Sequence, residues 1–331
     1  MAHGDAMAEE EEHELHMPHD RLFAATFGVP ANAAAFLRPN LPVKVAEAVS
    51  WEELQLLSGS FVDSAFKASH TDLLFSAPID GRHGLLYLLF EHQSTPDPAL
   101  PLRLLRYVTR IWERCLAEDG GDAKLPVVLP VVLSQNAQAW DVPNRLNAML
   151  DIPAQLAADL APFIPDFEYR HLQLADVPFD AIPGTPSGIL VLRVMKAERI
   201  GRLLDAVVWD PDLMDSAPLG LLQMVLRYML SADIDTQGFI AKIGELRHAE
   251  SRRSAMTLAQ RFRHEGRQEG RAEGFHTALQ LAVVEALELR FERTPDGLRE
   301  AVEGIQDDGT LRDLLRAAIR CQSIEEFARL L

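Results

Sequence analysis

The sequence predicts an α/β fold, in which a mixed central sheet is flanked by helices and followed by a mainly helical C-terminal region. Two apolar runs rich in Leu, Phe and Tyr, at 70–79 and 84–93, are joined by a segment with the Asp-Gly signature of a β-hairpin. An amphipathic helical pattern follows at about 100–118, and a β-branched run follows it at 125–135. A hairpin followed by a helix and a further strand is typical of a mixed α/β sheet.

The composition and apolar periodicity divide the chain of 331 residues into five parts. We expect a disordered acidic tail at 1–17, a core at 18–145, a mainly helical continuation at 146–250, a Glu/Gly/Arg-rich helical linker at 251–276 and a small helical bundle at 277–331. The tail has low hydrophobicity and a run of four Glu, which is typical of disorder. Its histidines could suggest a metal site, but a solvated tail is the simpler interpretation because no ordered scaffold holds them.

Helices are predicted before the hairpin, at about 20–28 and 31–37. The segment 43–60 is also helix-like, because Ser50 and Glu53 have the spacing of a capping box. Asp20 would be the N-cap or a first-turn residue of the first helix, which is a sufficient structural reason for an acid there.

The run 84–93 is apolar at almost every position, so we expect a central strand buried on both faces. Pro130 interrupts the run 125–135 and indicates that part of this strand lies at an edge or a bulge. A further strand is predicted within 168–177, and long buried helices at 187–209 and 218–231.

A four-residue repeat, EGRQ-EGRA-EGFH at 265–276, stacks Gly above Gly and Glu above Glu on a helix. Each Gly costs such a helix roughly 1 kcal/mol relative to Ala. The repeat therefore predicts either a marginal, bent linker or a close helix–helix contact. Helical periods continue to residue 331 with a break at Thr294 and Pro295, and these C-terminal helices are our candidate surface for homo-oligomer formation.

The net charge of −17 argues against a simple nucleic-acid binder, because phosphate contacts favour a basic surface. Residues 1–20 carry seven of the acidic side chains and no Lys or Arg, so the tail accounts for much of this charge. No apolar run reaches the ~18–20 residues of a membrane span, and the N-terminus has no signal-peptide pattern. Two cysteines in helical patterns favour reduced thiols and a cytoplasmic protein.

The ends of the two hairpin runs carry the candidate site. Residues two apart on a strand share a face, so Glu91 and Gln93 would point one way and His92 the other. The hairpin would bring Asp72 beside Glu91, and two close carboxylates are unfavourable without a cation such as Mg²⁺. Acids at strand ends are common, so this spacing has little specificity alone. Six apolar residues directly before Glu91 favour a functional role, because a buried unpaired carboxylate is costly.

Three segments carry a resemblance to a known family: HDRLFAATF at 19–27, FVDSAFKASHTDLLF at 61–75 and LLYLLFEHQSTPDPALPLRLLRYVTRIWER at 85–114. They resemble the recombination-promoting nucleases, also called YhgA-like transposases, of the PD-(D/E)XK nuclease superfamily, over roughly residues 18–210. The resemblance implies a restriction-endonuclease-like core and an endonuclease that cuts DNA with Mg²⁺ or Mn²⁺. It implies that Asp72 and Glu91 bind the metal, that Gln93 stands where the superfamily usually has Lys, and that Asp20 matches an acid of the first helix.

Gln93 can form hydrogen bonds but supplies no positive charge, so we expect this departure to affect the catalytic rate rather than the metal site. Arg103, Arg106 and Arg110, on the helix after the site, could contact DNA phosphates or could be solvated helix residues. The favoured hypothesis is a metal-dependent DNA endonuclease. The alternative is a catalytically weak relative that acts as a DNA-binding or protein-interaction scaffold, and a purely helical interaction protein would fit only the C-terminal third.

Overall fold

The computed structural model describes residues 18–57, 70–91, 96–118, 124–135, 140–232, 234–291 and 295–331. The chain forms two compact units, Met1–Leu258 and Ala259–Leu331, which are described separately. The first unit contains the sheet and the candidate site, and the second is helical. The predicted tail at 1–17 and the segment 58–69 lie outside the described residues.

A five-stranded sheet forms the centre of the first unit, with its strands in chain order. The strands are β1 Gln55–Leu56, β2 His70–Ile79, β3 Arg82–Glu91, β4 Val127–Ser134 and β5 Arg170–Gln173. Strands β1, β2 and β3 pair antiparallel, whereas β3, β4 and β5 pair parallel. The predicted mixed α/β sheet is therefore confirmed, and β3 is its central strand, as its apolar sequence indicated.

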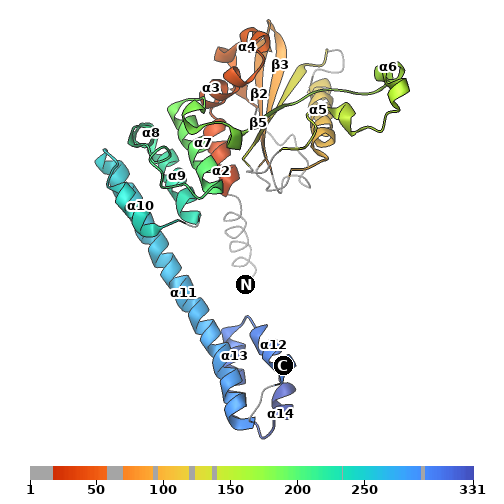
Figure 1. Ribbon diagram of the computed structural model, residues 1–331. Coiled ribbons are helices and arrows are strands. Elements are labelled where there is room, and N and C mark those ends of the chain that lie inside the picture. The colour runs from red at the N-terminus through yellow and green to blue at the C-terminus, as the bar shows by residue number, and fades with distance from the viewer. Residues whose placement is uncertain are drawn as a thin grey trace. The chain divides into compact units, whose positions relative to one another are not determined.

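Helices cover both faces of this sheet (Figure 1), with α5 on one face and the group α2, α3 and α7 on the other. The helices of the first unit are α2 Pro18–Phe27, α3 Pro30–Asn40, α4 Val43–Ala48, α5 Leu100–Glu118, α6 Ala157–Leu160, α7 Pro186–Arg199, α8 Pro211–Ser216, α9 Leu219–Ser231 and α10 Thr236–Ile243. Short 3₁₀ turns occupy Trp51–Glu53, Leu146–Met149, Ala154–Leu156, Ala161–Phe163, Leu174–Asp176 and Phe179–Ala181.

The hairpin between β2 and β3 is tighter than the sequence suggested. Its loop consists of Asp80 and Gly81 alone, with φ angles of 50° and 73°. Positive φ at both loop residues is the type I′ geometry, which matches the right-handed twist of the flanking strands. Strand β3 therefore begins at Arg82 and not at Gly84, and the tight loop sets the register of the whole hairpin.

The helix-like prediction for 43–60 is wrong for the described residues 49–57, and residues 58–60 lie outside the described part of the chain. Helix α4 ends at Ala48, and the side chain of Ser50 makes no capping bond to the 3₁₀ turn that follows. Gln55 and Leu56 instead pair with Ser76 and Phe75 of β2. Backbone pairing with an available sheet edge outweighs the modest helical preference of this short segment.

Pro130 lies in the part of β4 that has a neighbouring strand on one side only, where a residue without a backbone N–H is tolerated. Strand β4 pairs with β3 along its whole length, but β5 pairs with it only from Val131 onward. Residues 127–130 thus have one neighbouring strand, as the prediction of a partial edge required. The strand within 168–177 is also confirmed, as β5. Helix α7 ends at Arg199 rather than near residue 209, because Gly201 turns the chain with a φ of 64°.

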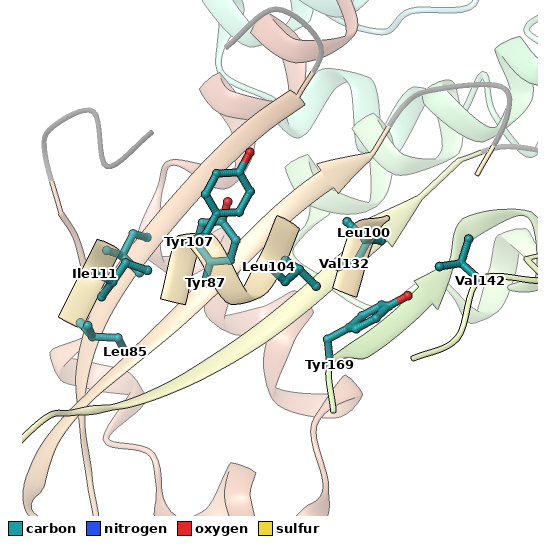
Figure 2. Packing of buried hydrophobic residues seen from close by; sticks show 10 residues of the cluster. Leu85, Tyr87, Leu100, Leu104, Tyr107, Ile111, Val132, Val142 and Tyr169 are labelled. Carbon is teal, nitrogen blue, oxygen red and sulfur yellow. The ribbon is translucent and has the colours of Figure 1, made fainter. Parts of the chain in front are cut away.

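The apolar core beneath α5 carries several tyrosines (Figure 2). Its buried members are Leu74, Leu85, Tyr87, Leu100, Leu104, Tyr107, Ile111, Val132, Val142 and Tyr169. The rings of Tyr87 and Tyr107 lie side by side, with centroids 5.6 Å apart. The phenol groups of Tyr87, Tyr107 and Tyr169 therefore lie on the face of the sheet that carries Asp72, a residue of the candidate site.

The division between the two units falls within one continuous helix, α11 Ala249–Phe291, which contains the Gly repeat. The remaining helices of the second unit are α12 Asp296–Glu303, α13 Asp308–Arg320 and α14 Ile324–Ala328. They bury a core of their own around Val283, Leu287, Leu311 and Phe327. Both cysteines are free thiols. Across the described residues, no helix combines the length and the apolar character needed to cross a membrane.

Candidate active site

The register of the hairpin brings the candidate acids to one edge of the sheet. Asp72 near the start of β2 pairs with Leu89, and His70 pairs with Glu91, the last residue of β3. Positions 72 and 91 are therefore diagonal neighbours, for which the typical Cα separation is about 7–8 Å. The side chain of Glu91, and His92 and Gln93 entirely, lie outside the described residues. The Oδ1 atom of Asp72 is inaccessible to solvent.

Helix α2, which carries Asp20, approaches the same edge from the other face of the sheet (Figure 1). Asp20 lies in the first turn of α2, which contacts β2, and its Oδ1 atom is also inaccessible to solvent. The neighbouring His19 places its Nδ1 atom 3.4 Å from the carboxamide of Gln135, the residue that directly follows β4. Because the preceding Ser134 pairs with Glu91, the start of α2 lies against the end of the strands that carry the site.

A buried polar cluster holds α2 in this place. The hydroxyl oxygen of Tyr228 on α9 lies 2.7 Å from Nδ1 of His19, and the two rings meet edge to face. With its amide oxygen directed at α7, Gln135 accepts from Nη2 and Nε of Arg199 at 3.0 and 3.2 Å. Burial, together with the charge of Glu198, raises the pKa of Tyr228, which keeps this phenol protonated. Helices α2, α7 and α9 and the end of β4 thereby meet next to His19, the residue that precedes Asp20.

A second polar group surrounds Asp72 on the face covered by α5. Burial raises the pKa of Tyr87 well above its usual range, and the nearby charge of Asp72 adds to the rise. The guanidinium of Arg103 acts on Tyr87 in the opposite direction. Its Nη1 atom donates to Oδ2 of Asp97 at 2.9 Å, and its side chain is only 12% exposed. Arg103 thus faces the core of the site rather than open solvent.

The three arginines proposed for DNA contacts differ in their accessibility. Arg106 is exposed, Arg110 is half-buried, and Arg103 is directed inward to Asp97. Of the three, Arg106 is therefore the side chain best placed to meet a phosphate from solvent. Their role in DNA binding remains a prediction.

Sequence reasoning did not identify a third polar group, on β4 and β5. Oγ of Ser134 lies 2.7 Å from Nε2 of His171, whose ring stacks on Trp140 at a centroid distance of 4.1 Å. Only the parallel register of β4 and β5 brings these residues together, so no local motif could reveal them. Tyr87 did have a signal: it precedes Glu91 by four residues, which on a strand means the same face.

His171 is expected to make folding stability depend on pH. Burial lowers the pKa of His171 to about 4, against about 6.5 in an unfolded chain. Between these values the unfolded chain binds the proton more strongly, so stability falls as the pH drops from 6.5 towards 4. Each pH unit would contribute at most about 1.4 kcal/mol, and less for a half-buried ring screened by solvent.

The variant His171→Gln keeps a polar partner for Ser134 but does not titrate. Its unfolding free energy, measured by urea denaturation at pH 7 and pH 5, should decline less than that of the wild type. An equal decline in both proteins would show that His171 is not responsible for the acid sensitivity.

The donor atoms at this edge are suited to a hard divalent cation. Asp20 and Asp72 supply carboxylate oxygens in solvent-inaccessible positions, and Mg²⁺ prefers oxygen ligands. Among the side chains that the structure describes, no three His, Cys, Asp or Glu groups form a complete metal site. Glu91 would be a third oxygen donor, and its backbone position is compatible with that role.

Comparison with known proteins was made against families, curated proteins and solved structures. The family model described as "Putative transposase, YhgA-like" matches residues 17–219. This match covers the whole sheet and the helices on both of its faces. The chain belongs to this family. No solved structure matches.

Several curated proteins of Escherichia coli are similar to this chain. The inactive recombination-promoting nuclease-like protein RpnE of strain K12 is 29% identical over 286 residues, which is 83% of this chain and 91% of RpnE. The recombination-promoting nuclease RpnA is 28% identical over 264 residues, covering 76% and 85% of the two chains. The nuclease RpnC is 36% identical over 118 residues, or 39% of its own length. A role in nuclease or recombination chemistry is thus supported, although some relatives are described as inactive.

Proposed function

We propose that this chain is a divalent-metal-dependent DNA endonuclease of the PD-(D/E)XK type, linked to recombination or mobile elements, and that it acts in the cytoplasm. The observation that carries the proposal is the hairpin register, in which Asp72 pairs with Leu89, two residues before Glu91. Asp20 approaches the same edge through the contact between His19 and Gln135. Family membership and relatives named as nucleases support the same activity.

In this proposal Asp72 and Glu91 would hold Mg²⁺ or Mn²⁺, with Asp20 beside them. When bound, the cation would neutralise carboxylate charge, polarise the phosphate and lower the pKa of a bound water. Gln93 would orient the attacking water by hydrogen bonding, as an uncharged substitute for Lys. Hydrolysis joins the water oxygen to phosphorus and breaks the bond from phosphorus to one sugar oxygen, which leaves with a proton.

The experiment for this proposal is plasmid cleavage by the purified full chain. Supercoiled DNA should be nicked or linearised with Mg²⁺ or Mn²⁺, and chelation by EDTA should stop the reaction, because Gln93 supplies no positive charge in place of the metal. Cleavage that persists in EDTA would contradict the metal-dependent mechanism.

The substitution Arg106→Gln should weaken DNA binding if this exposed arginine contacts phosphate.

The second candidate is a catalytically weak relative that binds DNA or protein as a scaffold. RpnE, which matches 83% of this chain, is described as inactive, and the net charge of −17 disfavours tight DNA binding. DNA binding without turnover in any divalent ion would decide for this candidate. Homo-oligomer formation through the C-terminal helices remains a separate prediction, and the exposed Leu289 and Ile319 favour it.

A further inference from the structure

Tyr87 on β3 lies close to Asp72, the residue of the candidate site on the neighbouring strand β2. It pairs with Leu74 across the hairpin, and the period of two along β2 puts Leu74 and Asp72 on one face. Tyr87 and Asp72 are therefore diagonal cross-strand neighbours on the face covered by α5. The tyrosine is 1% exposed, and the ring of Tyr107 packs beside it (Figure 2).

The hydroxyl of Tyr87 is a buried polar group that requires an acceptor. Its oxygen is inaccessible to solvent, and within the described residues it makes no hydrogen bond of normal geometry. Leaving a buried hydroxyl unsatisfied costs about 1–3 kcal/mol. Burial is the main cause of the raised pKa of Tyr87, and the charge of the nearby Asp72 and a hydrogen-bonding interaction with its side chain add to the rise. An acceptor of the right chemistry is thus adjacent.

The surroundings of Tyr87 fix its direction. The ring lies in the core cluster that also contains Leu85 and Leu104, and the ring of Tyr107 packs beside it. Arg103, held by Asp97, adds a positive charge on the same side. The phenol is therefore preorganised, and the carboxylate of Asp72 is a neighbour to which its hydroxyl can donate.

We propose that Tyr87 is a positioning residue for Asp72, whose carboxylate it orients by donating its O–H to one oxygen and leaving the other oxygen for a divalent cation. The inference rests on the proposed function, because it assigns a task to a residue behind a proposed metal ligand. Hydrogen bonds at such sites are often long without ligand and tighten on binding. Outer groups that orient metal ligands typically contribute 10–100-fold in metal affinity.

The test is a titration of the full chain with Mn²⁺ by isothermal calorimetry in the absence of DNA. Tyr87→Phe deletes only the hydroxyl and should weaken Mn²⁺ binding by about 10–100-fold. Tyr169→Phe is the matched control, because Tyr169 is also 1% exposed with a buried hydroxyl in the same cluster. It should bind Mn²⁺ as the wild type does. Asp72→Asn reports on the proposed metal site itself.

Each outcome separates the two claims. If Asp72→Asn loses Mn²⁺ binding while Tyr87→Phe keeps the wild-type affinity, the positioning role is wrong and the metal site stands. If the wild type binds Mn²⁺ no better than Asp72→Asn, both claims fail. Urea denaturation of the two phenylalanine variants controls for folding. A loss of affinity in Tyr87→Phe alone, at equal stability of the two variants, supports the inference.

DNA cleavage as a function of Mn²⁺ concentration supplies a second measurement. A positioning role predicts that Tyr87→Phe raises the metal concentration for half-maximal rate, while the rate at saturating Mn²⁺ stays near that of the wild type. An equal fall of the rate at every metal concentration would overturn the proposed role.

Discussion

Asp72→Asn is expected to lower metal-dependent DNA cleavage by at least roughly 100-fold, the scale on which losing one electrostatic group at a reaction centre lowers rates. The substitution keeps the shape of the side chain and removes its charge. Asp72 is the one acidic residue of β2, and it pairs with Leu89 at the edge where β3 ends. Glu91→Gln is expected to have the same effect. Cleavage is measured as the rate of plasmid nicking in Mg²⁺ and Mn²⁺.

The stability of the same variant provides an independent check. Carboxylates that approach one another without a cation repel and destabilise the fold. In EDTA, Asp72→Asn should therefore be at least as stable as the wild type. Asp159→Asn, a change at an exposed residue of α6, is the control and should leave cleavage unchanged. Cleavage by Asp72→Asn at the wild-type rate would remove Asp72 from the site and with it the proposed mechanism.

Lys196→Met is expected to lower the unfolding free energy of the first unit by about 3 kcal/mol, since a hydrogen bond contributes about 1 kcal/mol net. Lys196 on α7 is 8% exposed, and its Nζ atom donates to the carbonyls of Leu174, Ala175 and Val177 at 3.0, 2.7 and 2.5 Å. These carbonyls belong to the segment that directly follows β5. One ammonium group thus joins α7 to the parallel edge of the sheet.

Methionine preserves most of the volume of lysine but leaves the three carbonyls without this donor. Urea denaturation of the full chain measures the loss. Lys242→Met is the matched control, because Lys242 forms a solvent-screened pair with Glu245 at 2.9 Å and should cost less than about 1 kcal/mol. Equal losses of unfolding free energy in the two variants would show that the buried contacts of Lys196 stabilise the fold no more than the Lys242–Glu245 pair does.

The local pattern of residues predicted most of the sheet. Alternation, apolar runs and the Asp-Gly turn are local properties, and they indicated β2, β3, β4 and β5 together with helix α5. The strand Gln55–Leu56 was not predicted because a strand of two residues has almost no signal of its own. This segment becomes a strand only when the edge of β2 is available for pairing.

The sequence by itself determined the identity of the candidate acids, the strands that carry two of them and the central position of β3. Only the tertiary structure decided that helix α2, which carries Asp20, approaches the same edge and that Ser134 meets His171. The physical reason is the range of the interactions. Strand alternation acts between residues two apart, whereas these contacts depend on the register and packing of elements that lie far apart in the chain.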